Sequence, residues 1–530
     1  MRSSVDKGAP TSSESRAVGS NLAAALPTIK KHWWKRRHLV KLNFSIFGLL
    51  MLSSAGGFDG SLMNGLMALP QWNAFMDTPT GSWLGFINGI YSLGMGLALF
   101  ISAPISNKFG RKVGIWVGNA VLVVGTILQT VAQNQATFIS ARFFLGFAAA
   151  WYMSNVPLLI NETAYPTHRA ILSSLYNCGW YVGSLIAAWA TFATRNYESS
   201  WSWRVPSLLQ ALLPLVAVPG LILIPESPRW LISVGRGEQA REVLTHSHAG
   251  DDPNSTTLID YEIMEIESTL AAEKAAHDST SYMDMFKSKG NRRRLLISIS
   301  LGIFSQWVGN GVISYYLALV LNTVGVTSVT NQLLISAALQ LWNLIFAVGA
   351  AAYVDKLGRR ILFLASAAIM LVAFIVVTGL SGWFANTGHA GTGVAVIPFL
   401  FIFFAGYDIA LTPLLVSYTC EIWPYRLRSR GLSVMWITTV AAVFFNIFIN
   451  PIALEAIGWK YYLVFIVLCA VYGITAYFFY PETRGHTLEE MAVVFDGDEA
   501  EFSHGGEPTH TEKVGEKDTK INVMDQFESA

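Results

Sequence analysis

The chain has 530 residues, of which 52% are hydrophobic and only 13% are charged. A typical soluble domain carries about 25% charged residues, so this composition excludes an ordinary soluble protein. The formal net charge of +1 says little by itself, but the positions of the charged residues along the chain are informative.

Apolar runs of about 20 residues can cross the hydrocarbon core of a bilayer, which is about 30 Å thick. The first 40 residues are polar and then basic, and the first apolar run is too long for a cleavable signal sequence. The sequence then predicts twelve transmembrane helices, near residues 42–66, 84–105, 113–133, 137–160, 172–193, 205–224, 295–321, 331–354, 361–384, 394–420, 431–452 and 461–480.

Lysine and arginine gather in alternate connections between these runs, such as 108–112, 229–241 and 356–360. Because basic residues stay on the cytosolic side of a membrane, both termini are expected to be cytosolic. We therefore divide the chain into a cytosolic N-terminal tail, a six-helix bundle, a cytosolic helical linker, a second six-helix bundle and a cytosolic C-terminal tail, at residues 1–40, 41–231, 232–294, 295–483 and 484–530.

Three short cytosolic signatures each occur twice, at matching places in the two apolar halves. Residues 107–112 (NKFGRK) return at 355–360 (DKLGRR), and the PESPRWL segment at 225–231 is echoed by PETRG at 481–485. The third signature is Glu162, Pro166 and Arg169, which returns as Glu421, Pro424 and Arg428. A duplicated membrane domain of this kind predicts an all-α transporter with two pseudo-symmetric bundles.

Six hydrogen-bonding residues are expected near the middle of the membrane. At about 1.5 Å of rise per residue, they lie about 12 to 22 Å from the cytosolic ends of their helices. Aromatic residues such as Tyr315 and Tyr418 lie at neighbouring positions and offer apolar faces with polar handles. Amides beside aromatics suit an uncharged, polyhydroxylated solute, although hydrogen bonds between helices are the alternative. The six residues are Asn177, Gln306, Asn310, Asn343, Asp408 and Asn446.

A charged pair is expected in the outer half of the membrane. Asp59 lies about 27 Å from Lys41, and Arg142 lies about 30 Å from Glu162, so the two side chains reach the same depth. Isolated charges there would be costly, so the two are expected to pair. Protonation of Asp59 would release Arg142 and couple proton binding to a rearrangement; a static ion pair is the alternative.

At these residues the chain resembles the sugar porter family of the major facilitator superfamily, over residues 41–490. The segments PESPRWL and PETRG are highly specific for this family when both occur in one chain. Gly57-Phe58-Asp59-Gly60 resembles the first-helix motif whose Asp binds the proton in proton-linked members, and Arg142 falls at the position of its partner. The resemblance implies the major facilitator fold and a plasma-membrane location.

The strings at 176–183 and 305–311 are most similar to the branch of fungal lactose permeases and cellodextrin transporters, which also contains monosaccharide carriers. Val416 stands where hexose porters have a Trp, and this loss of a bulky ring favours a larger pocket. Asn107 replaces the usual Asp, so the resemblance implies a weaker lock in the first half. The implied cytosolic gate comprises Asn107, Arg111, Glu162, Arg169, Glu226, Arg229, Asp355, Arg359, Glu421, Arg428, Glu482 and Arg484.

The sequence therefore predicts a transporter that binds a disaccharide or a monosaccharide between two bundles and alternates access, driven by protons. A proton-independent facilitator and a non-transporting sugar sensor are the alternatives. No enzymatic triad, metal site or nucleotide loop stands out, so no enzyme activity, cofactor or nucleic-acid partner is expected. The expected partners are the sugar, the proton and the lipid bilayer, with a monomer as the functional unit.

Overall fold

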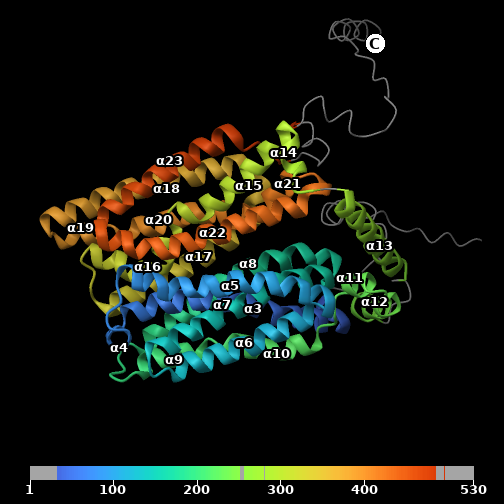
Figure 1. Ribbon diagram of the computed structural model, residues 1–530, viewed down its shortest axis with the longest axis horizontal. Helices are drawn as coiled ribbons and strands as arrows, with labels where there is room; N and C mark the ends of the chain where they lie inside the picture. Colours follow the sequence, from blue (N-terminus) through green and yellow to red (C-terminus); the bar gives the residue numbers. More distant parts are fainter. Residues whose placement is uncertain (1–32, 251–255, 280, 485–493, 496–530) are drawn as a thin grey trace, which may run out of the picture.

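The computed structural model describes residues 33–250, 256–279, 281–484 and 494–495, and the secondary structure in these ranges is helical. Figure 1 shows two bundles of long helices side by side, the first in blue to green and the second in yellow to red. The first bundle contains α3 (Arg37–Ala68), α5 (Gly81–Phe109), α6 (Arg111–Val131), α7 (Gln135–Thr163), α8 (Pro166–Thr194), α9 (Trp201–Leu209) and α10 (Leu212–Leu223).

The second bundle repeats this plan. It contains α15 (Lys289–Trp307), α16 (Asn310–Thr323), α17 (Val329–Leu357), α18 (Arg359–Thr387), α20 (Ile397–Asp408), α21 (Leu411–Ile422), α22 (Tyr425–Ile457) and α23 (Tyr462–Phe479). Short helices join the long ones: η1 (Trp33–Lys35), α4 (Pro70–Phe75), α19 (Ala390–Val394) and η4 (Gly458–Tyr461).

The helices confirm the predicted twelve-span architecture. By length and composition, 10 stretches of the described residues could cross a membrane, and one of them, Arg426–Phe479, covers both α22 and α23. The 29-residue α8 is not among them, but at about 1.5 Å per residue it is long enough to cross a bilayer. The sixth, seventh and tenth spans are each built from two helices.

The breaks in these three spans lie inside otherwise apolar runs. They separate α9 from α10 at Gln210 and Ala211, α15 from α16 at Val308 and Gly309, and α20 from α21 at Ile409 and Ala410. Gly309 has a φ of 109°, a backbone conformation that favours glycine. Each break frees backbone groups that need partners inside the membrane, and transporters often place binding sites at such points.

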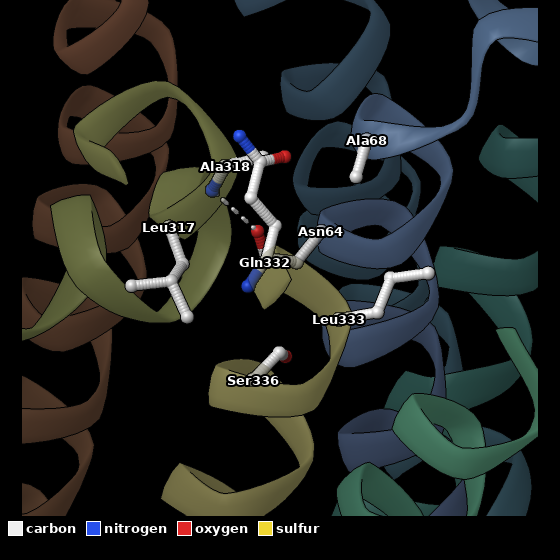
Figure 2. Close-up of a pocket in the computed structure, with 7 residues that line it drawn as sticks. All are labelled: Asn64, Ala68, Leu317, Ala318, Gln332, Leu333 and Ser336. Carbon is white, nitrogen blue, oxygen red and sulfur yellow. Dashed lines mark hydrogen bonds between the residues drawn. The ribbon is translucent and has the colours of Figure 1, made fainter. Parts of the chain in front are cut away.

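The bundles meet on the side away from the linker, near α4 and α19 (Figure 1). There the backbone N–H of Ala318 on α16 donates to Asn64 Oδ1 on α3 at 3.3 Å. Figure 2 shows this seam with Ala68, Leu317, Gln332, Leu333 and Ser336 around the bond, and the space between them has no room for a water molecule. The two bundles are therefore in contact at this seam, on the side that the sequence predicts to be extracellular.

Close backbone contact extends the seam between α5 and α22. A Cβ atom placed on Gly85 would lie 2.6 Å from the carbonyl oxygen of Phe448, so a larger residue would force the two helices apart. Small residues on the facing surfaces of membrane helices let the helices approach closely. The glycines of the second span thus help to close the extracellular side.

The linker between the bundles contains α11 (Pro228–Ser233), α12 (Gly237–Leu244), η2 (Thr245–Ala249), α13 (Thr256–Ser279) and α14 (Asp284–Lys287), and α15 already begins within the segment predicted as linker. Buried His248 joins it to the first bundle, with Nδ1 2.8 Å from Glu262 Oε2 and Nε2 3.1 Å from the Thr163 carbonyl. On the other bundle, the guanidinium of Arg430 lies 5.6 Å from the centre of the Tyr282 ring. The linker therefore contacts both bundles on the cytosolic side.

Candidate functional site

The structure brings Asp59 and Arg142 together inside the first bundle. Arg142 Nη1 on α7 lies 3.0 Å from Asp59 Oδ1 on α3, and the two residues are only 3% and 2% exposed. Arg142 Nε also donates to the Ile87 carbonyl at 3.0 Å, which orients the guanidinium. The pair thus ties α3, α5 and α7 together through one buried charge interaction.

Gln210 is a third member of this group that the sequence reasoning missed. Its Nε2 donates to Asp59 Oδ1 at 3.2 Å from the break between α9 and α10. It lies about 22 Å along the span from Pro225, so the depth calculation used for the other spans would have found it. Asp59 thus accepts hydrogen bonds from two other elements, α7 and the break between α9 and α10.

A second group forms around the break between α15 and α16. Asn446 Nδ2 on α22 donates to the freed carbonyl of Gln306 at 2.8 Å. Asn310 Nδ2 donates to the Tyr407 hydroxyl at 3.2 Å, and that hydroxyl donates to the Ser305 carbonyl at 2.8 Å. Tyr407 was not predicted, because its role depends on hydroxyl contacts to residues of other helices. Three predicted amides thus lie at one point in the second bundle.

Asp408 lies next to Tyr407 and connects the two bundles. The hydroxyl of Tyr181 on α8 donates to Asp408 Oδ1 at 2.5 Å, and Thr412 Oγ1 donates to the same oxygen at 2.7 Å. Asp408 is 0% exposed, and its Oδ2 accepts no hydrogen bond from the described residues. A buried acceptor therefore lies at the boundary between the bundles, where a bound solute would contact both.

Aromatic rings flank the same boundary. A Cβ atom on Gly60 of α3 would lie 3.2 Å from the Tyr315 ring and 3.8 Å from the Trp180 ring. The Trp180 side chain is 40% exposed, whereas Tyr316 is buried and donates to the Ile447 carbonyl at 2.5 Å. Trp180 and Tyr315 thus lie together beside Gly60 of α3, and Tyr316 has a packing role.

The expectation that Tyr418 belongs to the central site is wrong. Tyr418 is 0% exposed, and its hydroxyl donates to the Pro481 carbonyl at 2.9 Å, at the cytosolic end of the second bundle. Asn343 is buried on α17, with an Oδ1 that accepts no hydrogen bond from the described residues. The side chain of Asn177 lies outside the described part of the chain.

The repeated cytosolic signatures form matching contacts in the two bundles. Glu226 accepts from the backbone N–H groups of Arg111 at 3.1 Å and Lys112 at 3.2 Å, the first residues of α6. Glu482 accepts from Arg359 at 2.8 Å and Arg360 at 3.0 Å, the first residues of α18. A carboxylate at a helix N-terminus satisfies unpaired N–H groups and complements the helix dipole.

Glycines leave room for these carboxylates. Gly110 and Gly358 precede the two helices with φ of 103° and 90°, and a Cβ on either would come within 3.0 Å of a carboxylate oxygen of Glu226 or Glu482. The glycine of each repeated signature is therefore required both by its backbone conformation and by the space that the glutamate occupies.

The two glutamates differ in their electrostatics. Burial raises the pKa of the Glu226 carboxyl, and hydrogen bonds from the backbone N–H groups of Ser227, Lys112 and Arg111 oppose that rise. Burial also acts to raise the pKa of Glu482, but four backbone hydrogen bonds outweigh it and the pKa lies below its ordinary value. The second clamp therefore holds a more stable anion than the first.

Ion pairs complete each cytosolic cluster. Arg111 Nε lies 3.6 Å from Glu162 Oε2 in the first bundle, and Arg359 Nη2 lies 3.0 Å from Glu421 Oε1 in the second. Asn107 Oδ1 accepts from Arg111 Nη1 at 2.9 Å. Of the remaining gate residues, Arg169 and Arg428 lie in the first turns of α8 and α22, Arg229 lies in α11, and the backbone N–H of Arg484 donates to Glu482. The side chain of Asp355 lies outside the described residues. Among the described residues, no group of three His, Cys, Asp or Glu side chains could hold a metal ion.

Comparison with known proteins identifies the family. Residues 46–495 match the family described as "Sugar (and other) transporter". The chain belongs to this family. The transporter is 27% identical over 460 residues to the high-affinity glucose transporter of Kluyveromyces lactis, covering 82% of this chain and 81% of the relative. It is also 27% identical over 492 residues to the sugar transporter STL1 of Saccharomyces cerevisiae, covering 90% and 85%.

The fold of the transporter is similar to that of a solved structure. The proton:xylose symporter XylE bound to 6-bromo-6-deoxy-D-glucose superimposes with a TM-score of 0.67 and 22% identity, covering 86% of this chain and 99% of the other. The transporter is thus a multi-pass membrane protein of the sugar porter family with the major facilitator fold. These relatives do not single out the lactose permease and cellodextrin branch.

Proposed function

We propose that this sugar transporter is a proton-coupled symporter of the plasma membrane that functions as a monomer. It binds its sugar between the two bundles and alternates between conformations open to either side. The observation that carries this proposal is the buried pair of Asp59 and Arg142, at 3.0 Å. The solved structure with a similar fold is named as a proton:xylose symporter, which supports the same mechanism.

Protonation of Asp59 supplies the coupling step. The neutral carboxyl no longer balances the charge of Arg142, which is buried and costly to leave unpaired. Arg142 then moves toward other acceptors, and α3 and α7 shift relative to each other. Because Gln210 also donates to Asp59, the same proton loosens α9 and α10. Because the two bundles exchange between two arrangements, this local change shifts the equilibrium between those arrangements.

The sugar is bound at the boundary between the bundles. The oxygens Asn310 Oδ1, Asn343 Oδ1 and Asp408 Oδ2 are buried and accept no hydrogen bond from the described residues. Sugar hydroxyls are donors that fit such acceptors, and unpaired buried acceptors cost about 1 to 3 kcal/mol each. Trp180 and Tyr315 provide apolar ring faces beside them. Asn177, Gln306 and Asn446 complete the proposed site.

We favour a disaccharide of the lactose or cellobiose type as substrate. Val416 stands where hexose porters have a Trp, and the loss of a bulky ring at this position favours a larger pocket. The strings shared with fungal lactose permeases and cellodextrin transporters point the same way. Glucose is the second candidate, because the relative from Kluyveromyces lactis is named a high-affinity glucose transporter.

The cytosolic residues act as the gate. With the extracellular side closed, Arg111 and Arg359 pair with glutamates of their own bundle. In the opposite conformation the two clusters approach each other and hold the cytosolic side shut. Asn107 lacks the charge of an Asp, so the first bundle contributes less to this lock. Asp355 contributes the matching charge in the second bundle.

Uptake into proteoliposomes tests the proposal. The purified protein is supplied with labelled lactose, cellobiose, glucose and xylose, with and without an inwardly directed proton gradient. Gradient-driven accumulation of lactose or cellobiose is expected. Equal uptake with and without the gradient would identify a facilitator, and binding without flux would identify a sensor. Asn310→Ala should raise the KM of the transported sugar, with exposed Asn196→Ala, which lies outside the site, as the control.

A further inference from the structure

A cavity on the cytosolic side of the first bundle is not used by the transport mechanism. It has a volume of about 900 Å³ and lies between the start of α3 and the linker helices α11 and α12. Arg37 and Lys41 line it from α3, and Arg236 and Val243 line it from the linker. Phe109 and Leu223, at the ends of α5 and α10, also line it. Its volume is in the range of small-molecule sites.

Basic side chains outnumber acidic ones around the cavity, because Arg37, Lys41 and Arg236 line it with two glutamates. The three cations form no ion pair with an acidic side chain in the part of the chain that the structure describes. Glu226 is held by the backbone N–H groups of α6, and Glu242 Oε1 lies 4.0 Å from His246 Nε2. Three cations not paired with either glutamate are thus available to a multiply charged anion.

The apolar side of the cavity faces the membrane. Phe109 and Leu223 are 51% and 44% exposed at the cytosolic ends of transmembrane helices, where lipid chains meet the headgroups. Just before α3, Trp33 and Trp34 are 42% and 55% exposed and are followed by Lys35, Arg36 and Arg37. Exposed tryptophans beside basic residues mark the interface with an anionic leaflet.

We propose that this cavity binds the phosphorylated headgroup of an anionic phospholipid of the inner leaflet. The phosphomonoester lies among Arg37, Lys41 and Arg236, and the acyl chains leave past Phe109 and Leu223. A headgroup bound in this way bridges α3 and the linker, and so fixes the linker against the bundle that carries Asp59. The site is independent of the sugar, and its test does not depend on transport.

Binding of short-chain lipids to the full-length protein, reconstituted in phosphatidylcholine nanodiscs, tests this proposal. A short-chain phosphatidylinositol phosphate is compared with short-chain phosphatidylserine, and with free inositol phosphate and ATP. Tight binding is expected only of the phosphatidylinositol phosphate. The combined variant Arg37→Gln, Lys41→Gln and Arg236→Gln should bind this lipid about a hundredfold more weakly, because each basic side chain near the surface contributes about fivefold.

The control is a variant with the same change of charge on exposed basic residues outside the cavity, namely Lys274→Gln, Lys289→Gln and Arg292→Gln. Equal loss of binding in both variants would show attraction to charge alone and overturn the site. Equally tight binding of free inositol phosphate or ATP would identify a soluble ligand and overturn the lipid.

A photoreactive phosphoinositide provides a second measurement on the unchanged protein. Labelling within residues 37–45 or 223–247 would support the cavity, and labelling confined to other segments would overturn it.

Discussion

Replacement of Asp59 by Asn separates proton coupling from sugar binding. In the structure, Asp59 is the acidic partner of Arg142 at 3.0 Å, and Gln210 donates to the same oxygen at 3.2 Å. The side-chain oxygen of the substituted asparagine can still accept a hydrogen bond from Gln210, but the side chain cannot ionise. Removing one partner of a buried ion pair typically costs about 3 to 5 kcal/mol, because the other charge remains buried.

The size of the proton gradient sets how far the sugar can accumulate. One pH unit supplies about 1.4 kcal/mol per proton, so a symporter that carries one proton per sugar accumulates its sugar about tenfold. Asp59→Asn should abolish this accumulation and leave counterflow of labelled sugar across the same vesicles. The assay is uptake into proteoliposomes, followed until the internal sugar concentration is constant.

The double variant controls for damage to the fold. Asp59→Asn together with Arg142→Gln removes both charges, so it should melt at a higher temperature than either single variant and still lack accumulation. Tenfold accumulation by Asp59→Asn would refute the role of Asp59 in coupling. A double variant no more stable than the singles would refute the pairing energy inferred from the structure.

Three further predictions follow from other contacts. Tyr181→Phe removes one of the two donors to Asp408 Oδ1 and leaves only Thr412. A lost hydrogen bond to a carboxylate costs about 1 to 3 kcal/mol, so the sugar KM should rise about 5-fold or more while exposed Tyr282→Phe leaves it unchanged; an unaltered KM would remove the bridge between the bundles from the site. Gly85→Leu should wedge the extracellular seam open and increase labelling of a cysteine placed at Ser336, whereas Gly96→Leu, where a Cβ meets nothing within 4 Å, should not; equal labelling of both contradicts the seam. Glu482 has a lowered pKa, so the stability it provides is present above its ordinary pKa and is lost as pH falls; Glu482→Gln should therefore lower the melting temperature at neutral pH, with the difference from the unchanged protein shrinking in acid. Glu226 has a raised pKa, so its ionisation weakens the fold as pH rises, and Glu226→Gln should cost less at neutral pH; equal losses for the two would show that their electrostatics do not differ.

The helices could be predicted from the sequence because each apolar run must satisfy its own backbone hydrogen bonds inside the membrane. The breaks within three spans could not. The break before Asn310 depends on Asn446 of α22, which reaches the freed carbonyl of Gln306, and such a partner is distant in sequence. The helix propensity of the residues along the seventh span does not by itself indicate this break.

The site was predicted unevenly because depth along a helix does not tell which way a side chain points. Tyr418 was placed with the midplane residues although it is only three positions from Glu421, and the rise per residue already puts it about 4.5 Å from the cytosolic end. Tyr407 was missed because its role depends on two hydroxyl contacts to other elements. Gln210 was missed only because the depth calculation was not applied to the sixth span.

The clamps of Glu226 and Glu482 have a consequence for how the two halves of the chain can diverge. Each carboxylate holds main-chain N–H groups, and every residue other than proline provides one. Mutations can therefore replace the side chains at positions 112 and 360 without releasing the helix ends. The contacts at the two helix ends therefore require only the glutamate and the glycine of each half, so the sequences of the two halves can diverge at the neighbouring positions while these contacts stay the same.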